Sequence, residues 1–228
     1  MAKRIIAIDG PAGSGKSTTA KLVAKKLNFL YLDTGAMYRA ITLKALENGV
    51  DVNDEKGLEK LTKNSTISFK NENGIDKIFL DGQDVTEEIR EPWVDQNVSF
   101  VSMHKRVRKI LVEKQKGIGR KNDVVAEGRD TTTVVFPHAL KIYLDADLKE
   151  RARRRFLELK EKGIHTSLEE QIKEITRRDK LDSEREASPL CLDKDAMVVD
   201  TTHLTIEEQV NKVIELYKVK SGAVSAGS

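Results

Sequence analysis

Five short apolar runs, each followed by a segment of helical period, restrict the possible folds of this 228-residue chain more than any other feature. The runs span residues 4–9, 29–33, 123–127, 140–145 and 196–200. Each run is almost continuously apolar, which is typical of strands covered by helices on both faces. The order predicts an α/β fold with a five-stranded parallel sheet, helices on both faces, and ligands bound beyond the carboxyl ends of the strands.

Several of the predicted helices have recognisable starts or faces. In three of them a potential N-cap residue precedes a glutamate by three positions, which is the spacing of a capping box. These pairs are Asp147 with Glu150, Ser167 with Glu170, and Thr205 with Glu208. The last helix carries an apolar stripe at helical spacing, formed by Ile206, Val210, Val213, Ile214 and Tyr217.

The segment from residue 61 to residue 91 departs from this strand–helix order. Apolar and polar residues alternate on both sides of Asn73-Gly74, a dipeptide favoured in tight hairpin turns. We predict an antiparallel hairpin here, carried as a small insertion on the rim of the α/β core.

Composition favours an intracellular globular protein without nucleic acid or membrane partners. The 40 basic and 37 acidic residues leave a net charge of +3, which does not call for a nucleic-acid partner. A single cysteine, Cys191, allows no disulfide within the chain and favours the cytoplasm. The apolar stretch before Asp9 is too short for a signal peptide or a membrane span. Residues 221–228 are small and polar, and we expect a disordered tail.

A phosphate-binding loop follows the first apolar run directly and opens a helical segment. It reads Gly10-Pro11-Ala12-Gly13-Ser14-Gly15-Lys16-Ser17 and matches the P-loop pattern G-x-x-x-x-G-K-[S/T] at every fixed position. Glycines let successive backbone N–H groups face the phosphates, and the helix N-terminus adds partial positive charge. In such a loop Lys16 reaches the β- and γ-phosphates, and the hydroxyl of Ser17 ligates Mg²⁺. We therefore predict that ATP binds here with Mg²⁺, along the loop as far as Thr18.

The loop predicts nucleotide binding and leaves the reaction open. A GTPase would need an N-K-x-D element, and the nearest string, residues 192–195, lacks the asparagine. The glycine-rich signature of a transport ATPase does not follow downstream. Arginines are abundant in the second half of the chain, which favours phosphoryl transfer between nucleotides, where arginines clamp two sets of phosphates.

Three further segments narrow this class to a family. They read Asp33-Thr34-Gly35-Ala36-Met37-Tyr38-Arg39, then Glu127-Gly128-Arg129-Asp130 with residues 133–137, then Arg178-Asp179-Lys180-Leu181-Asp182-Ser183-Glu184-Arg185 with residues 187–190. With the loop, and in this order, they closely resemble bacterial cytidylate kinases of the nucleoside-monophosphate (NMP) kinase family, from about residue 4 to residue 217. The resemblance implies transfer of a phosphoryl group from ATP to CMP, and to dCMP, with release of ADP.

The resemblance also implies a role for each matching position. The acceptor phosphate would be held by Arg39, Arg129 and Arg178, and cytosine would be read by Ser99, Arg108 and Asp130. The ribose would be contacted by Thr34, Asp182 and Arg185, with Tyr38 and Gly128 in the same CMP site. The metal's water shell would be oriented by Glu127, and the donor phosphates would be clamped by Arg151, Arg154 and Arg155. The catalytic set would be Lys16, Arg129, Arg154 and Arg178.

Helical spacing agrees with two of these sets. They are Arg178, Asp182 and Arg185 at i, i+4 and i+7, and Arg151, Arg154 and Arg155 at i, i+3 and i+4. Like charges so placed repel one another unless an anion lies among them, so the second set favours bound phosphate. A plain exposed face is the alternative for that set, and Arg106 is the alternative to Arg108.

We expect one kinase domain over residues 1–220. Its parts are a core of residues 1–33, 104–150 and 168–220, an NMP-binding region with the insertion at 34–103, and a short lid at 151–167 with Gly163 near its tip. By resemblance the protein would be a monomer. Two alternatives stay open: a kinase of the same fold with another acceptor, such as UMP or AMP, and a P-loop regulator that binds nucleotide without transferring phosphate.

Overall fold

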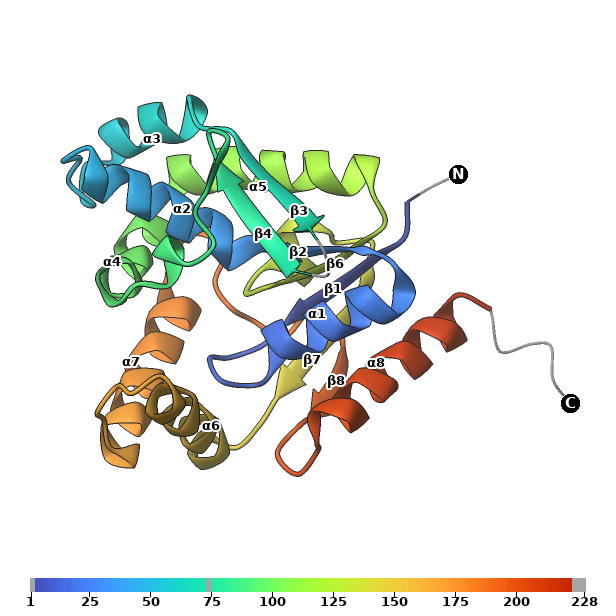
Figure 1. Ribbon diagram of the computed structural model, residues 1–228. Helices are drawn as coiled ribbons and strands as arrows, with labels where there is room; N and C mark the ends of the chain where they lie inside the picture. Colours follow the sequence, from blue (N-terminus) through green and yellow to red (C-terminus); the bar gives the residue numbers. More distant parts are fainter. Residues whose placement is uncertain (1–2, 73–74, 223–228) are drawn as a thin grey trace, which may run out of the picture.

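The computed structural model of the chain describes residues 3–72 and 75–222. Its centre is a five-stranded sheet in the order β2-β6-β1-β7-β8, in which neighbouring strands are parallel (Figure 1). The strands are β1 (Ile5–Asp9), β2 (Leu30–Asp33), β6 (Val124–Gly128), β7 (Leu140–Asp145) and β8 (Met197–Asp200). All five strands predicted from the apolar runs are confirmed. Because β1 is the middle strand, the loop that follows it opens at the centre of the sheet's carboxyl edge.

Helices cover both faces of this sheet, because successive side chains of β1 point to opposite faces and those from Ile5 to Ile8 are apolar. One face is covered by α1 (Lys16–Leu27) and α8 (Ile206–Lys220), the other by α2 (Thr34–Glu47) and α5 (Lys105–Lys121). Ile6 and Ile8 belong to the hydrophobic core on the α1 and α8 face, with Val210 and Val213 of α8. Ala7 belongs to the core on the α2 and α5 face. The predicted apolar stripe of the last helix thus packs on the sheet through its central residues.

The rim insertion forms an antiparallel sheet separate from the central one. It consists of β3 (Ile67–Glu72), β4 (Ile75–Leu80) and the two-residue strand β5 (Gln83–Asp84). Phe69 lies opposite Ile78, and Ile78 packs against α2. The hairpin is therefore confirmed, while its predicted turn at Asn73-Gly74 lies outside the described residues. Strand β5 was not predicted, because two polar residues carry no alternation.

The remaining helices lie on either side of the carboxyl edge. On one side, beside the insertion, are α3 (Glu55–Lys63), the short 3₁₀ turn η1 (Glu88–Arg90) and α4 (Pro92–Met103); on the other are α6 (Leu148–Glu161) and α7 (Leu168–Glu184) (Figure 1). Ala152 of α6 and Ile175 of α7 share a small core with Ala12 of the phosphate-binding loop. Residues 151–167, predicted as a lid, are thus most of α6 and its connection to α7. None of the helices in the described part of the chain has both the length and the apolar character needed to cross a bilayer.

The carboxyl end of β1 is fastened to the segment that follows β6. That segment, η2 (Thr131–Val135), is a short π-helical turn. The buried Asp9 carboxylate accepts hydrogen bonds from the backbone N–H and the hydroxyl of both Thr131 and Thr132, at 2.6–3.0 Å. Burial raises the pKa of Asp9, and these hydrogen bonds act in the opposite direction. Such a set of donors compensates for the removal of the carboxylate from water.

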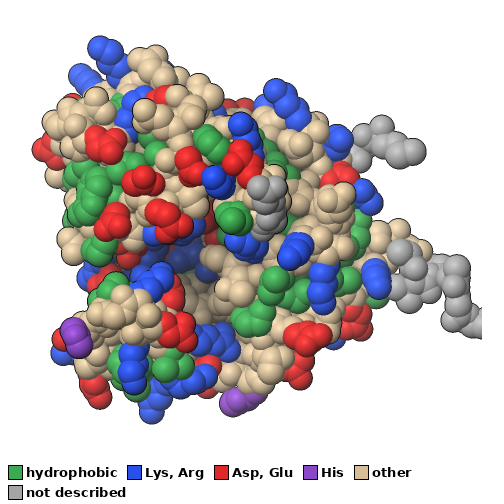
Figure 2. All heavy atoms as spheres, viewed as in Figure 1, with side chains coloured by type: hydrophobic (Ala, Val, Ile, Leu, Met, Phe, Trp, Pro, Cys, Tyr) green, Lys and Arg blue, Asp and Glu red, His purple; other side chains and the backbone are tan. Residues whose placement is uncertain are grey.

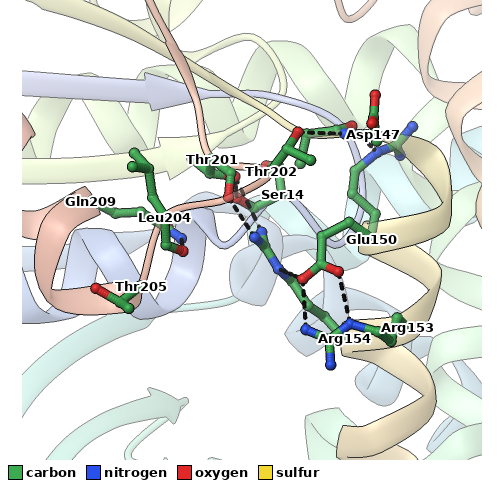
Figure 3. Close-up of polar contacts among 12 residues, drawn as sticks. Ser14, Asp147, Glu150, Arg153, Arg154, Thr201, Thr202, Leu204, Thr205 and Gln209 are labelled. Carbon is green, nitrogen blue, oxygen red and sulfur yellow. Dashed lines mark hydrogen bonds and ion pairs between the residues drawn. The ribbon is translucent and has the colours of Figure 1, made fainter.

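The predicted capping boxes are confirmed at Ser167 and Thr205, where the hydroxyl and the following glutamate bond each other's backbone N–H. The one predicted at Asp147 is wrong, because its side chain makes no capping hydrogen bond. Figure 3 shows the reason: the Glu150 carboxylate accepts from two arginines, and the Asp147 backbone N–H donates to Thr202 Oγ1 at 3.0 Å.

Candidate active site

The phosphate-binding loop has the backbone that its glycines allow. Gly10, Gly13 and Gly15 have φ angles of 153°, 75° and 91°. A Cβ atom on Gly10 would lie 2.0 Å from the backbone oxygen of Leu144, and one on Gly13 would lie 2.9 Å from that of Arg151. The loop therefore passes so close to β7 and α6 that a side chain at either position would push it out of shape.

Lys16 is turned into the loop that precedes it. Its ammonium donates to the backbone oxygen of Pro11 at 2.7 Å, and the residue is only 5% exposed. Burial lowers the pKa of Lys16 to about 7, and the nearby guanidinium of Arg129 acts in the same direction. An anion at this position would relieve both effects, so the site fits a phosphate group.

Oxygen atoms suited to Mg²⁺ lie beside the loop. The Ser17 hydroxyl donates to Glu127 Oε1 at 2.8 Å, and the Tyr31 hydroxyl donates to the same atom at 3.4 Å. Burial and the neighbouring carboxylate of Asp33 raise the pKa of Glu127, whereas Lys16 acts to lower it. A hydroxyl and a carboxylate side by side are ligands that Mg²⁺ prefers, directly or through water, so these residues fit the ion.

Asp33 has a structural task that the sequence did not reveal. One of its oxygens caps α2 by accepting from Ala36 N at 2.8 Å, and the other pairs with Arg90 of η1 at 2.6 Å. Burial would raise the pKa of Asp33, but the Arg90 guanidinium outweighs it and the pKa is lowered. The pair joins the rim insertion to the start of α2, which carries Thr34, Tyr38 and Arg39.

Arg108 and Asp130 form a buried ion pair on the side of α2 and α5. Arg108 donates to Asp130 Oδ2 at 2.5 Å, and the two side chains are 4% and 5% exposed. The guanidinium also lies 5.0 Å from the ring centre of Tyr38. Arg106, the alternative to Arg108, is exposed and pairs with Glu59 on α3. Of the two arginines, Arg108 is the buried one that pairs with Asp130.

Three polar atoms around this pair have no hydrogen-bond partner among the residues that the structure describes. They are Tyr38 Oη, Arg108 Nε and one terminal nitrogen of Arg185. Burial lowers the pKa of Arg185, and repulsion from Arg108 acts in the same direction. Buried donors are normally satisfied, so unpaired donors grouped in this way indicate a place for a polar ligand.

The three arginines predicted to hold the acceptor phosphate converge in the structure. Arg39 and Arg178 approach the same carboxylate, Asp95, at 2.5 and 3.6 Å, and Arg129 pairs with Asp182 at 2.8 Å. Burial lowers the pKa of Arg178, and its neighbours Arg129 and Arg39 lower it further. These arginines therefore lie close enough to repel one another in the absence of a further anion.

The other residues predicted for the acceptor site lie on several elements. The hydroxyl of Thr34 donates to the Glu127 backbone oxygen at 2.7 Å, next to Gly128, where a Cβ atom would lie 2.3 Å from Thr34 Oγ1. Asp182 also faces Arg185, at 3.5 Å. Ser99 lies half-buried on α4. Their individual roles stay predictions.

The three arginines predicted as a donor clamp reach three different places. Arg151 is buried and donates to the backbone oxygens of Ala146 and Ala12, which braces α6 against the loop. Arg154 donates to Glu150 and to the backbone oxygen of Thr201, at 3.0 and 2.5 Å (Figure 3). Arg155 extends toward α4, where it lies 3.6 Å from Asp95.

Three residues to which the sequence analysis gave no role also contact the loop or the start of α1. The Thr201 hydroxyl donates to the backbone oxygen of Ser14 at 3.0 Å, and Gln209 Oε1 accepts from Thr19 at 2.9 Å (Figure 3 shows Ser14, Thr201 and Gln209). Asp179 accepts from Ala12 N at 3.0 Å. Of Thr201, Gln209 and Asp179, Asp179 alone belongs to a segment that the sequence analysis had quoted.

The surface is hollowed between the two sides of the site. Figure 2 shows a recess between the part that carries α4 and the part that carries α6 and α7, with Lys and Arg side chains lining its floor. Lys16 of the phosphate-binding loop lies close enough to Arg129 and Arg178 for both guanidinium groups to lower its pKa, so the loop and these two predicted acceptor-side arginines are neighbours. A recess with a basic floor and a neighbouring glycine loop suits phosphorylated ligands.

Comparisons with known proteins identify the family to which the sequence is similar. A family model described as cytidylate kinase matches residues 6–219. A cytidylate kinase of Clostridioides difficile is 52% identical, covering 94% of this chain and 98% of that protein. One of Caldanaerobacter subterraneus is 53% identical, covering 92% of each. Among solved structures, an uncharacterized protein from Eubacterium ventriosum is 13% identical with a TM-score of 0.52, covering 95% of this chain and 99% of that one, a likeness of fold alone.

Proposed function

Because the chain belongs to the cytidylate kinase family, we propose that it transfers the γ-phosphoryl group of ATP to the phosphate of CMP or dCMP and releases ADP. The family predicted from the four sequence segments is confirmed by the relatives. The observation that supports the substrate most directly is the buried Arg108–Asp130 pair with unpaired donors around it.

Cytosine offers an exocyclic amine and two acceptors on its pairing edge, which a carboxylate and a guanidinium can match. We propose that Asp130 accepts from the amine while Arg108 and its neighbours donate to the ring. Uracil has an oxygen in place of the amine, so it would face the Asp130 carboxylate with a second acceptor. The site would therefore reject UMP because one buried Asp130 oxygen would lack a donor and face another acceptor, rather than through the size of the base.

Phosphoryl transfer needs positioning and charge compensation more than covalent chemistry by the protein. In our proposal the loop N–H groups and Lys16 hold the β- and γ-phosphates of ATP, while Arg39, Arg129 and Arg178 hold the acceptor phosphate in line with them. No general base is required, because the attacking phosphate oxygen is already an anion. Mg²⁺, held by Ser17 directly and by Glu127 through water, would neutralise further phosphate charge.

Water must be kept from the γ-phosphate, or ATP would be hydrolysed. We propose that α6 and its connection to α7 close over the donor as a lid and bring Arg154 and Arg155 onto its phosphates. In the ligand-free structure Arg154 is held by Glu150 and Thr201, so closure would exchange these partners for phosphate oxygens. We further propose that the protein acts as a monomer in the cytoplasm, which the family and the single cysteine, Cys191, support.

The experiment that tests this proposal is an acceptor panel. Purified protein with ATP and Mg²⁺ is assayed for ADP release with CMP, dCMP, UMP and AMP in turn, and without acceptor. We expect CMP and dCMP to give the highest kcat/KM. A higher value for UMP or AMP would assign another acceptor, and ATP turnover that no acceptor stimulates would favour a nucleotide-binding regulator.

A further inference from the structure

Asp95 gathers three arginines that come from three different helices. It lies in the first turn of α4 and faces Arg39 of α2 at 2.5 Å, Arg155 of α6 at 3.6 Å and Arg178 of α7 at 3.6 Å. Nothing in the sequence set this aspartate apart from other acidic residues in first helical turns. In the structure it is the anion shared by Arg39 and Arg178, two of the predicted acceptor-phosphate arginines, and by Arg155 of the predicted donor clamp.

The charges around Asp95 are unbalanced. Burial would raise the pKa of its carboxyl, but the guanidinium groups of Arg39 and Arg178 outweigh burial and lower it. The pKa of Arg178 is nevertheless lowered by burial and by its neighbours Arg129 and Arg39, so Asp95, at 3.6 Å, does not offset the repulsion at this guanidinium. A phosphate monoester carries more negative charge and more acceptor oxygens than a carboxylate, and planar guanidinium groups match it well.

The contact also spans the cleft. Asp95 belongs to the α4 side of the recess, whereas Arg155 and Arg178 belong to the α6 and α7 side (Figures 1 and 2). Any anion that replaces the carboxylate between these arginines separates Asp95 from both helices of the opposite wall.

We propose that Asp95 is a positioning residue that stands in for the acceptor phosphate in the ligand-free protein. It holds Arg39 and Arg178 together, with Arg155 beside them, before a nucleotide binds, and it yields Arg39 and Arg178 to the acceptor phosphate and Arg155 to the donor side. The same carboxylate competes with small anions, which can offer the arginines only part of what a bound nucleotide offers. This inference rests on the proposed function, since it takes the arginine group to be the acceptor-phosphate site.

The test measures anion binding in the absence of any reaction. Inorganic phosphate is titrated calorimetrically into Asp95→Asn and its parent, both carrying Lys16→Met so that the glycine loop contributes weakly and equally. Removing the competing carboxylate is expected to tighten phosphate binding roughly fivefold. Glu174→Gln is the matched control, because it removes a carboxylate that pairs with Arg177 on the outer side of α7, and phosphate affinity should not change.

Unchanged or weaker phosphate binding by a folded Asp95→Asn protein would overturn the inference. If Asp95→Asn does not fold, Asp95→Glu provides a second test. This variant keeps the negative charge, so it should bind phosphate with the affinity of the parent. A fivefold gain in phosphate affinity in Asp95→Glu would equally overturn the inference. With Lys16 intact, Asp95→Asn should also lower the KM for CMP, whereas loss of a purely structural contact would raise KM and lower the melting temperature. Because the titration needs no turnover, a wild-type protein inactive on CMP would count against the proposed function alone.

Discussion

Arg108 and Asp130 face each other at 2.5 Å in a part of the protein from which water is almost excluded, with both side chains at most 5% exposed. The pair satisfies one guanidinium nitrogen and one carboxylate oxygen, while Arg108 Nε and the neighbouring Tyr38 hydroxyl have no partner among the described residues. Leaving such groups unpaired costs stability. The pair therefore has the character of a binding surface that is complete only with its ligand.

Substitution of Asp130 tests this surface. Asp130→Ala removes the acceptor proposed for the cytosine amine, so the ratio of kcat/KM for CMP over UMP should fall roughly tenfold or more. The change also leaves Arg108 as a buried charge without its partner, which should lower the free energy of unfolding by about 3 kcal/mol. Steady-state assays with both acceptors and chemical denaturation measure the two effects. Arg106→Ala, at an exposed position, is the control, and an unchanged CMP to UMP ratio in Asp130→Ala would show that Asp130 does not read the base.

Lys16 is the residue on which turnover should depend most. Lys16→Met removes the charge that faces the donor phosphates and replaces it with an apolar chain of similar length, so kcat should fall at least about a hundredfold. The fold should persist, because the hydrogen bond that the ammonium makes within the described part of the chain is to a loop carbonyl. Circular dichroism and thermal melting provide the control. Retention of most of the activity would contradict the assignment of the loop to ATP.

Proton uptake should accompany ATP binding at alkaline pH. Burial holds the pKa of Lys16 at about 7 in the empty site, and phosphate oxygens favour the charged amine, so binding raises this pKa. Below pH 7 the proton is already present, whereas above pH 7 it must be taken up, and ATP affinity therefore falls as the pH rises. Calorimetry at pH 8 in two buffers of different ionisation enthalpy should show uptake approaching about one proton. Lys16→Arg, which stays charged, should show none, and equal values for the two proteins would refute this linkage.

Gly128 should tolerate no side chain while Thr34 keeps its hydroxyl. A Cβ atom at position 128 would lie 2.3 Å from Thr34 Oγ1, so Gly128→Ala should lower the free energy of unfolding by about 1–3 kcal/mol. Adding Thr34→Ala removes the colliding oxygen, so the double variant should be more stable than the sum of the two single effects. Denaturant melts of the four proteins measure this coupling. Simple additivity would show that the strain arises elsewhere.

The sheet could be predicted because strands buried on both faces leave continuous apolar runs in the sequence. The phosphate-binding loop could be predicted because its function requires glycines and a lysine at fixed spacing. The capping box at Asp147 could not be judged from spacing alone, since Glu150 is drawn to Arg153 and Arg154 instead. Contacts between residues far apart in the sequence could not be predicted either, because they produce no pattern in the residues around them. Asp95 looked like any acid in a first helical turn, and only the folded chain brings arginines from three helices to it.

The four hydrogen bonds onto Asp9 have a mechanical consequence. They connect the base of the glycine loop to η2, which directly follows Arg129 and Asp130, so the loop and these two predicted acceptor-site residues are held in a fixed relative position. Any movement that closes the proposed site would then come from the helices beside it and not from the carboxyl edge of the sheet. The amide protons of Thr131 and Thr132 should accordingly be among the slowest in the protein to exchange with deuterium.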